Sequence, residues 1–143
     1  MANAKPVQED KLHMTLVFLG MVTTAQQAHL INAAARLSGN RFMMEIDRSG
    51  WWKRPRILWL APGQVPDALS VLQSELARLA LACGVDIETR PYLPHITLAH
   101  KANTAVNIEF RPIHWRVHDF CLFESITRMG YVEYKIIQCW PLT

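Results

Sequence analysis

A short pattern of histidine and threonine occurs twice in this chain and constrains its fold more than any other feature. His13-Met14-Thr15-Leu16 lies near the start, and His95-Ile96-Thr97-Leu98 lies about two-thirds of the way along. Polar and apolar residues alternate in both copies, which is typical of β-strands, where residues two apart share one face. We therefore expect two strands that each present an imidazole beside a hydroxyl, with the apolar residues of each pattern in the core.

Placed side by side, these two strands would bring both histidines and both threonines into one cleft. A single copy of such a short pattern is more often structural than catalytic, because it arises easily by chance. Two copies with equal spacing in strand-like surroundings favour a shared function. They also suggest a molecule built from two similar halves.

The rest of the sequence alternates between helical and strand-like segments. A threonine pair at 23–24, followed by apolar residues with helical spacing, predicts a helix over 24–38 that ends at Ser38-Gly39-Asn40. Leucines at helical spacing predict a second helix over 66–82, ended by Cys83-Gly84. Strands are expected over 11–19, 42–46, 57–60, 85–88, 94–99, 114–125 and 131–140.

This order of segments predicts a single α+β domain over residues 1–143. We expect two pseudo-symmetric lobes, each a small antiparallel sheet with a helix packed outside, and a central active-site cleft between them. With 143 residues, half of them hydrophobic, the chain can bury a sizeable core.

The composition indicates a cytoplasmic protein. No apolar run is long enough to span a bilayer, and the N-terminus lacks the pattern of a secretory signal. Cys83, Cys121 and Cys139 are too few for a disulfide framework and lack the paired spacing of a zinc site. Cys121 and Cys139 can approach each other across the final hairpin, but two small buried side chains in a reduced compartment are the stronger interpretation.

Three basic residues cluster at one place in the sequence, beside two tryptophans. The net charge of +3 is too low for a protein that holds duplex nucleic acid by its backbone. Lys53, Arg54 and Arg56 cluster beside Trp51 and Trp52, and such neighbours can hold a single-stranded nucleic-acid end by stacking and phosphate contact. A solvated loop above a buried tryptophan pair explains the same residues equally well.

The flanks of the two patterns are more specific than the patterns themselves. They run from Asp10 to Gly20 and from Arg90 to Leu98. Two further segments are also informative, namely the stretch from Trp51 to Leu60 and the closing hairpin up to Trp140. On these residues the chain resembles the two-histidine phosphoesterases, and within them the RNA 2',3'-cyclic phosphodiesterases, also called 2'-5' RNA ligases. The resemblance covers most of the chain and implies hydrolysis of RNA 2',3'-cyclic phosphate ends, or of related nucleotides, to 2'-phosphates without metal or cofactor.

Opening a cyclic phosphate needs one group to take a proton from water and another to protonate the departing ribose oxygen. Two imidazoles suffice, because an unperturbed imidazole titrates near pH ~6.5 and can serve as either partner. The resemblance implies His13 as general acid and His95 as general base. The nearly symmetric sequence does not fix that order, and the same pair run backwards would catalyse ligation. Thr15 and Thr97 are expected to donate hydrogen bonds to the nonbridging oxygens.

Further contacts to the substrate are expected from a small group of cationic and aromatic side chains. These are Arg56, Arg90, His100, Lys101 and Trp52. Ordinary surface charge is the commoner role for such arginines and lysines. The other histidines are expected at the surface: His29, His114 and His118. Nothing in their spacing predicts a metal site.

Two departures from the family pattern matter. Relatives usually begin with a strand and a helix before the first histidine, whereas few residues precede His13 and residues 1–6 resemble neither element. An uncovered sheet edge is a liability, so we expect either a monomer or a strand-exchanged homodimer. The second departure is His100-Lys101, which stands where close bacterial relatives often carry an arginine.

Two other classes of function fit the same residues. An RNA-end binding module would hold a terminal phosphate without turnover, and an interaction protein would use the exposed sheet edge as its partner surface. A scaffold has no physical need for four polar residues that face one cleft, so the paired patterns favour an enzyme.

Overall fold

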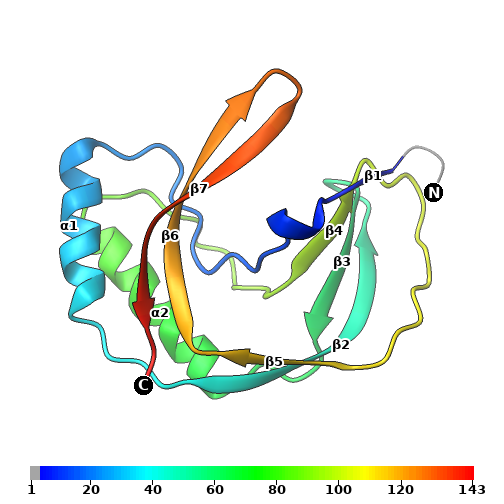
Figure 1. Ribbon diagram of the computed structural model, residues 1–143, viewed down its shortest axis with the longest axis horizontal. Helices are drawn as coiled ribbons and strands as arrows, with labels where there is room; N and C mark the ends of the chain where they lie inside the picture. Colours follow the sequence, from blue (N-terminus) through cyan, green and yellow to red (C-terminus); the bar gives the residue numbers. More distant parts are fainter. Residues whose placement is uncertain (1–3) are drawn as a thin grey trace. The chain divides into compact units, whose positions relative to one another are not determined.

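The computed structural model describes residues 4–143, which divide into two compact units (Figure 1). The first unit combines the residues up to Leu16 with Met43–Pro66 and Arg90–Trp115, and the second combines Val17–Phe42, Asp67–Thr89 and Arg116–Thr143. In chain order the elements are β1 (Lys5–Pro6), the 3-10 helix η1 (Glu9–Lys11), α1 (Thr24–Ala35), β2 (Phe42–Trp52), β3 (Ile57–Pro62), α2 (Asp67–Ala82), β4 (Ile96–His100), β5 (Ile113–Val117), β6 (Asp119–Arg128) and β7 (Tyr131–Pro141).

A five-stranded sheet in the order β1-β4-β3-β2-β5 forms the frame of the first unit. β3 pairs antiparallel with both β2 and β4, and its residue Leu58 lies between Trp51 of β2 and Ala99 of β4. Leu58, Ala99 and Ala102 form a buried cluster against which Trp51 packs. β2 is longer than the predicted 42–46, because its pairing with β3 continues through both tryptophans.

The N-terminal residues cover one edge of β4. Lys5 pairs with His100 and Pro6 with Ala99, and the backbone N–H of Val7 donates to the carbonyl of Leu98 at 2.8 Å. The prediction that residues 1–6 contribute no strand is therefore wrong for residues 5–6, while residues 1–3 lie outside the described part. A two-residue strand has no readable periodicity, and only its pairing with β4 defines it.

The second unit contains both α-helices. Thr23 begins α1 with a capping box, in which its side chain accepts from the N–H of Gln26 and the Gln26 side chain accepts from the N–H of Thr23. The helix ends at Ala35, shorter than the predicted 24–38, whereas α2 agrees with its prediction to within one residue at its start. The α+β class with two helices and antiparallel sheets is confirmed, and both helices belong to the second unit.

The hairpin of β6 and β7 forms the separate two-stranded sheet, and in Figure 1 it extends as a ribbon beyond the helices of its own unit. Gly130 makes the tight turn with a φ of 81°. Cys121 and Cys139 are register partners and form a disulfide, so the interpretation of two reduced side chains is wrong. A register shift next to Leu122 brings the two cysteines opposite each other.

Three predicted strands differ from the structure. The segment 11–19 is no regular strand, because Lys11 belongs to η1 and the segment makes only an isolated bridge. Residues 85–88 form no strand, because the N–H of Val85 is used to close α2 by donating to the carbonyl of Ala80 at 3.0 Å. The segment 114–125 divides at His118, whose carbonyl accepts from the N–H of Leu142 at 2.8 Å. Within residues 4–143, neither α-helix is long and apolar enough to cross a membrane.

Candidate active site

The two histidine patterns meet at one isolated antiparallel bridge, between Met14 and Ile96. Both patterns belong to the first unit, so the meeting point lies within one packed body. β4 offers only five residues for pairing along this edge. β1 takes the end of β4 and Met14 takes its start, which is why the first pattern is held by a single bridge.

This bridge brings the two patterns side by side in antiparallel direction. In a regular antiparallel pair with this register, His13 would lie across from Thr97 and Thr15 across from His95. Because successive side chains of a strand alternate between faces, all four would then lie opposite the apolar bridge residues.

The two imidazoles are oriented in the same way. Nδ1 of His13 lies 2.8 Å from the carbonyl oxygen of Lys11, and Nδ1 of His95 lies 2.8 Å from the carbonyl oxygen of Leu93. A carbonyl oxygen only accepts, so each Nδ1 carries a hydrogen and donates it. In a neutral ring, Nε2 is then the nitrogen with the lone pair, and in a protonated ring it is the nitrogen that can give up its proton.

Two tryptophan side chains, Trp52 and Trp59, form an aromatic wall beside His95. The ring centroids of Trp52 and His95 lie 4.7 Å apart at an interplanar angle of 70°, and those of Trp52 and Trp59 lie 5.3 Å apart. Gly50 makes room for the wall, since a Cβ at this position would lie 2.2 Å from Cζ2 of Trp59. Trp52 was predicted to contact substrate, and the structure places it against a histidine of the pair.

Tyr92 links the two patterns directly. Its hydroxyl donates to the carbonyl oxygen of Thr15 at 2.7 Å, although the two residues are far apart in the sequence. Burial raises the pKa of Tyr92 to about 12, so the phenol keeps its proton and continues to donate near neutral pH. This bond and the Met14–Ile96 bridge hold the first pattern against the second.

The predicted cationic contacts fall into two places. Arg90 is exposed on the segment that leads to His95, and His100 is exposed at the last position of β4. Lys101 follows β4 directly, and Arg56 lies nearby on the β2–β3 turn, with its carbonyl accepting from the N–H of Ala102 at 2.9 Å. Lys101 and Arg56 therefore lie together beyond the end of β4, whereas the histidines lie at its start. The side chains of His29, His114 and His118 are exposed, as predicted.

Sequence reasoning gave no role to three residues that the structure draws into this region. Tyr92 stands within the flank of the second pattern, and a tyrosine between two prolines just before the histidine was the available signal. Lys5 and Asn103 had no such signal, because their neighbours are set by the pairing of β1 with β4 and by the turn after β4.

Across residues 4–143, no three histidine, cysteine, aspartate or glutamate side chains are grouped as ligands of a metal ion. An arrangement of two imidazoles with two hydroxyls on one face is suited to general acid and base catalysis at a phosphate ester.

Comparison with known proteins gives consistent similarities. Residues 2–127 match the family model of the 2'-5' RNA ligase superfamily. The sequence is 36% identical over 141 residues to the RNA 2',3'-cyclic phosphodiesterase of Escherichia coli (strain K12), covering 97% of this chain and 80% of that protein.

Solved structures agree with the sequence match. The crystal structure of E. coli LigT in apo form has a TM-score of 0.91 at 34% identity and covers 99% of this chain and 82% of that one. E. coli LigT complexed with 3'-AMP has a TM-score of 0.89 at 33% identity, covering 98% and 82%.

Proposed function

The chain belongs to the 2'-5' RNA ligase superfamily, and from this membership we propose that it hydrolyses 2',3'-cyclic phosphodiesters at RNA ends to 2'-phosphates. The observation that carries the proposal is the antiparallel Met14–Ile96 bridge, which brings the two patterns together within one unit. We propose that their imidazoles and hydroxyls share one face there. The relative from E. coli that shares 36% identity is an RNA 2',3'-cyclic phosphodiesterase.

In the proposed reaction, a water molecule attacks the phosphorus of the cyclic diester. Nε2 of His95 takes a proton from this water as the new P–O bond forms. The bond from phosphorus to the ribose 3'-oxygen breaks, and Nε2 of His13 gives its proton to that oxygen. The products are a 2'-phosphate and a 3'-hydroxyl, and each proton transfer is worth roughly 10²–10⁴-fold in rate. If a 5'-hydroxyl attacked the cyclic diester in place of water, the same two proton transfers would form a 2'-5' phosphodiester and release the 3'-hydroxyl.

The threonines and the aromatic wall have supporting roles in this proposal. Thr15 and Thr97 donate hydrogen bonds to the nonbridging oxygens, where negative charge increases in the transition state. Trp52 packs against the ring of His95 and presents the aromatic surface on which a terminal base can stack. His100 and Arg90 are proposed to contact the same phosphate, with His100 in the place of the family's usual arginine.

RNA with cyclic phosphate ends, or a related nucleotide, is therefore the proposed partner, and the cytoplasm is the proposed compartment. A monomer is the proposed state, because residues 5–7 of the same chain pair with the edge of β4 that strand exchange would use. Since Cys121 and Cys139 are joined, activity is best measured both with and without a thiol reductant.

The test is hydrolysis of an oligonucleotide with a 2',3'-cyclic phosphate end in the presence of a chelator, with the product phosphate located by phosphorus NMR. We expect a 2'-phosphate, and we expect His13→Ala and His95→Ala each to abolish turnover while the fold stays intact. Thr15→Val should reduce the rate less than either. Wild-type rates in a histidine variant would refute the mechanism, and RNA-end binding without any turnover would identify a binding module instead.

A further inference from the structure

A cluster of five cations surrounds the turn between β2 and β3 and the end of β4. We call it the basic cluster, and its members are Lys5, Lys53, Arg54, Arg56 and Lys101. They come from three separate parts of the first unit, namely β1, the β2–β3 turn and the residue after β4. Within residues 4–143, none of the five forms an ion pair with a carboxylate.

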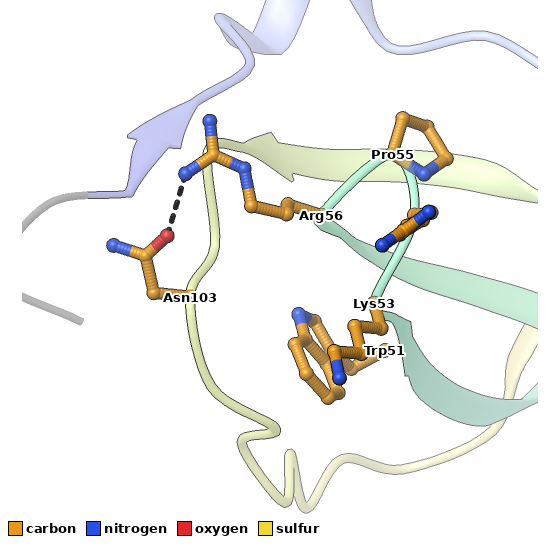
Figure 2. Close-up of a pocket in the computed structure, with 6 residues that line it drawn as sticks. Trp51, Lys53, Pro55, Arg56 and Asn103 are labelled. Atoms are coloured by element: carbon orange, nitrogen blue, oxygen red, sulfur yellow. Dashed lines mark hydrogen bonds between the residues drawn. The ribbon is translucent and has the colours of Figure 1, made fainter.

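An open pocket of about 560 Å³ lies within this cluster (Figure 2). We call it the Trp51 pocket, and it is lined by Trp51, Lys53, Arg54, Pro55, Arg56 and Asn103. Figure 2 shows that the Lys53 side chain extends beside Trp51, whereas the guanidinium of Arg56 extends toward Asn103. Three of the six lining residues are therefore cationic, and none is acidic.

Hydrogen bonds hold the walls of the pocket together. Nε1 of Trp51 donates to the carbonyl of Ala102 at 2.8 Å, and the N–H of Ala102 donates to the carbonyl of Arg56 at 2.9 Å. Nη1 of Arg56 donates to Oδ1 of Asn103 at 2.7 Å. The β2–β3 turn and the segment after β4 are thus tied to each other, so their cations keep a common position.

The backbone is held in an unfavourable conformation at two of the cations. Arg56 has a φ of 58° and Lys101 a φ of 56°, and they are the two non-glycine residues with positive φ in the described chain. Left-handed backbone is costly for residues with a Cβ and is concentrated at functional sites. Both residues with this conformation belong to the basic cluster.

The like charges of the basic cluster also repel one another, which is unfavourable in addition to the backbone conformation. The pKa of Lys101 is lowered, first by the positive charge of Lys5, then by a side-chain hydrogen bond with Lys5, and to a lesser degree by burial and by Arg56. Cations that repel one another without a carboxylate partner bind a polyanion favourably, because each phosphate relieves the repulsion and releases counterions.

We propose that the Trp51 pocket binds phosphates of the single-stranded RNA chain that leads to the terminal cyclic phosphate, a role that rests on the proposed function at the histidines. Grooves for single-stranded nucleic acid combine cations that follow the backbone with aromatic side chains, and this pocket has both. The enzyme would then favour RNA chains over mononucleotides.

The position of the pocket favours an oligonucleotide rather than a second contact to the terminal nucleotide. Lys101 follows Thr97 by four residues along β4, which corresponds to roughly 13 Å at ~3.3 Å per residue. Consecutive phosphates of a nucleic acid are closer together than this. A phosphate at the basic cluster therefore belongs to a nucleotide farther along the chain than the one whose cyclic phosphate lies at the histidines.

The test compares the double variant Lys53→Gln/Arg54→Gln with the wild type. Both side chains are exposed, so the change removes charge with little effect on the fold. Arg36→Gln, an equally exposed change at the end of α1, is the matched control. Two quantities are measured: the Kd for a single-stranded RNA with a plain 3'-hydroxyl end over a range of salt concentrations, and the KM and kcat for a nucleoside 2',3'-cyclic monophosphate.

We expect the double variant to raise the Kd for RNA about three- to tenfold, and to lower the slope of log Kd against log salt by about 0.7 for each phosphate that the variant no longer binds. KM for the mononucleotide should change by a smaller factor, and Arg36→Gln should match the wild type in all measurements. An unchanged Kd and salt slope would overturn the proposal.

Two further outcomes separate this proposal from the proposed function. If the double variant impairs the mononucleotide reaction as much as it weakens RNA binding, the cations serve the terminal phosphate and the pocket proposal fails. If the wild type hydrolyses no cyclic phosphate but the double variant still weakens RNA binding, the proposed function fails while the pocket proposal stands.

Discussion

Tyr92→Phe tests whether the first histidine pattern is held in place by the second. The substitution removes one hydroxyl and leaves the ring, so packing around the half-buried side chain is preserved. The variant lacks the 2.7 Å hydrogen bond to the carbonyl of Thr15. Thr15 follows His13 by two residues, so the change acts on the position of His13, the proposed general acid, and not on its chemistry.

The size of the effect follows from the surroundings of that bond. A hydrogen bond within a protein contributes about 0.5–1.5 kcal/mol net, and Thr15 is exposed, so water can replace the missing donor and the lower part of that range applies. A loss of roughly 0.5–1 kcal/mol lowers the Tm by about 1–4 °C for a chain of this length. If all of this free energy serves to align His13, kcat falls by at most about fivefold, since 1.36 kcal/mol corresponds to ~10-fold.

The assay pairs thermal unfolding with turnover of a 2',3'-cyclic phosphate. Unchanged Tm and kcat in Tyr92→Phe would refute the link between the patterns. A loss of activity far above fivefold with an intact Tm would also refute it, because Tyr92 would then act on the substrate itself.

The pH dependence of the same variant gives an independent check. Burial raises the pKa of Tyr92 from 10.0 to about 12, so above pH 10 the unfolded chain releases this proton while the folded chain keeps it. The unfolded state then binds fewer protons, and stability falls as pH rises through this window, whereas below pH 10 the group contributes no slope. Tyr92→Phe has no phenol to titrate, so its stability lacks this pH dependence. The difference in Tm between the wild type and the variant should therefore shrink above pH 10. A difference that stays constant would show that the phenol is not protected by burial.

Two other substitutions test local parts of the structure. Gly50→Ala should lower stability by about 1–3 kcal/mol and reduce kcat, because its Cβ would displace Trp59 and with it Trp52 beside His95. Thermal unfolding and kcat measure this, and adding Trp59→Phe should restore part of the stability. A Gly50→Ala variant with unchanged stability and kcat would contradict the packing described. Thr23→Ala removes the capping box of α1 and should cost about 1 kcal/mol in urea unfolding with kcat unchanged, whereas a changed kcat would mean that α1 affects the site.

Local signals in the sequence were sufficient where the structure depends on near neighbours. The threonine pair at 23–24 predicted the start of α1, and the leucine spacing predicted α2. Helix caps and buried apolar stripes depend on residues that lie close together in the sequence, so a local pattern is enough to predict them. The two patterns were predicted to lie side by side, and the bridge between Met14 and Ile96 pairs them. That their four polar residues share a face stays a prediction.

Features that depend on strand register could not be predicted from the sequence. Cys121 faces Cys139 only because the β6–β7 register shifts next to Leu122; counted without that shift from the turn, Cys121 would face Gln138. The meeting of Lys5 with Lys101 likewise depends on the pairing of β1 with β4, which joins segments from opposite ends of the first unit. Pairing between distant segments is decided by the packing of the whole sheet rather than by local pattern.

The same dependence explains why the two histidines are not equivalent in how they are held. His95 leads directly into β4, which pairs with β3 on one edge and with β1 and Met14 on the other, so its position follows from the frame of the sheet. His13 lies outside any regular strand, and its pattern is joined to the second pattern by the Met14–Ile96 bridge and by the bond between Tyr92 and Thr15. The ring of His95 also packs against Trp52. The structure thus builds a nearly symmetric pair of side chains on an unsymmetric frame.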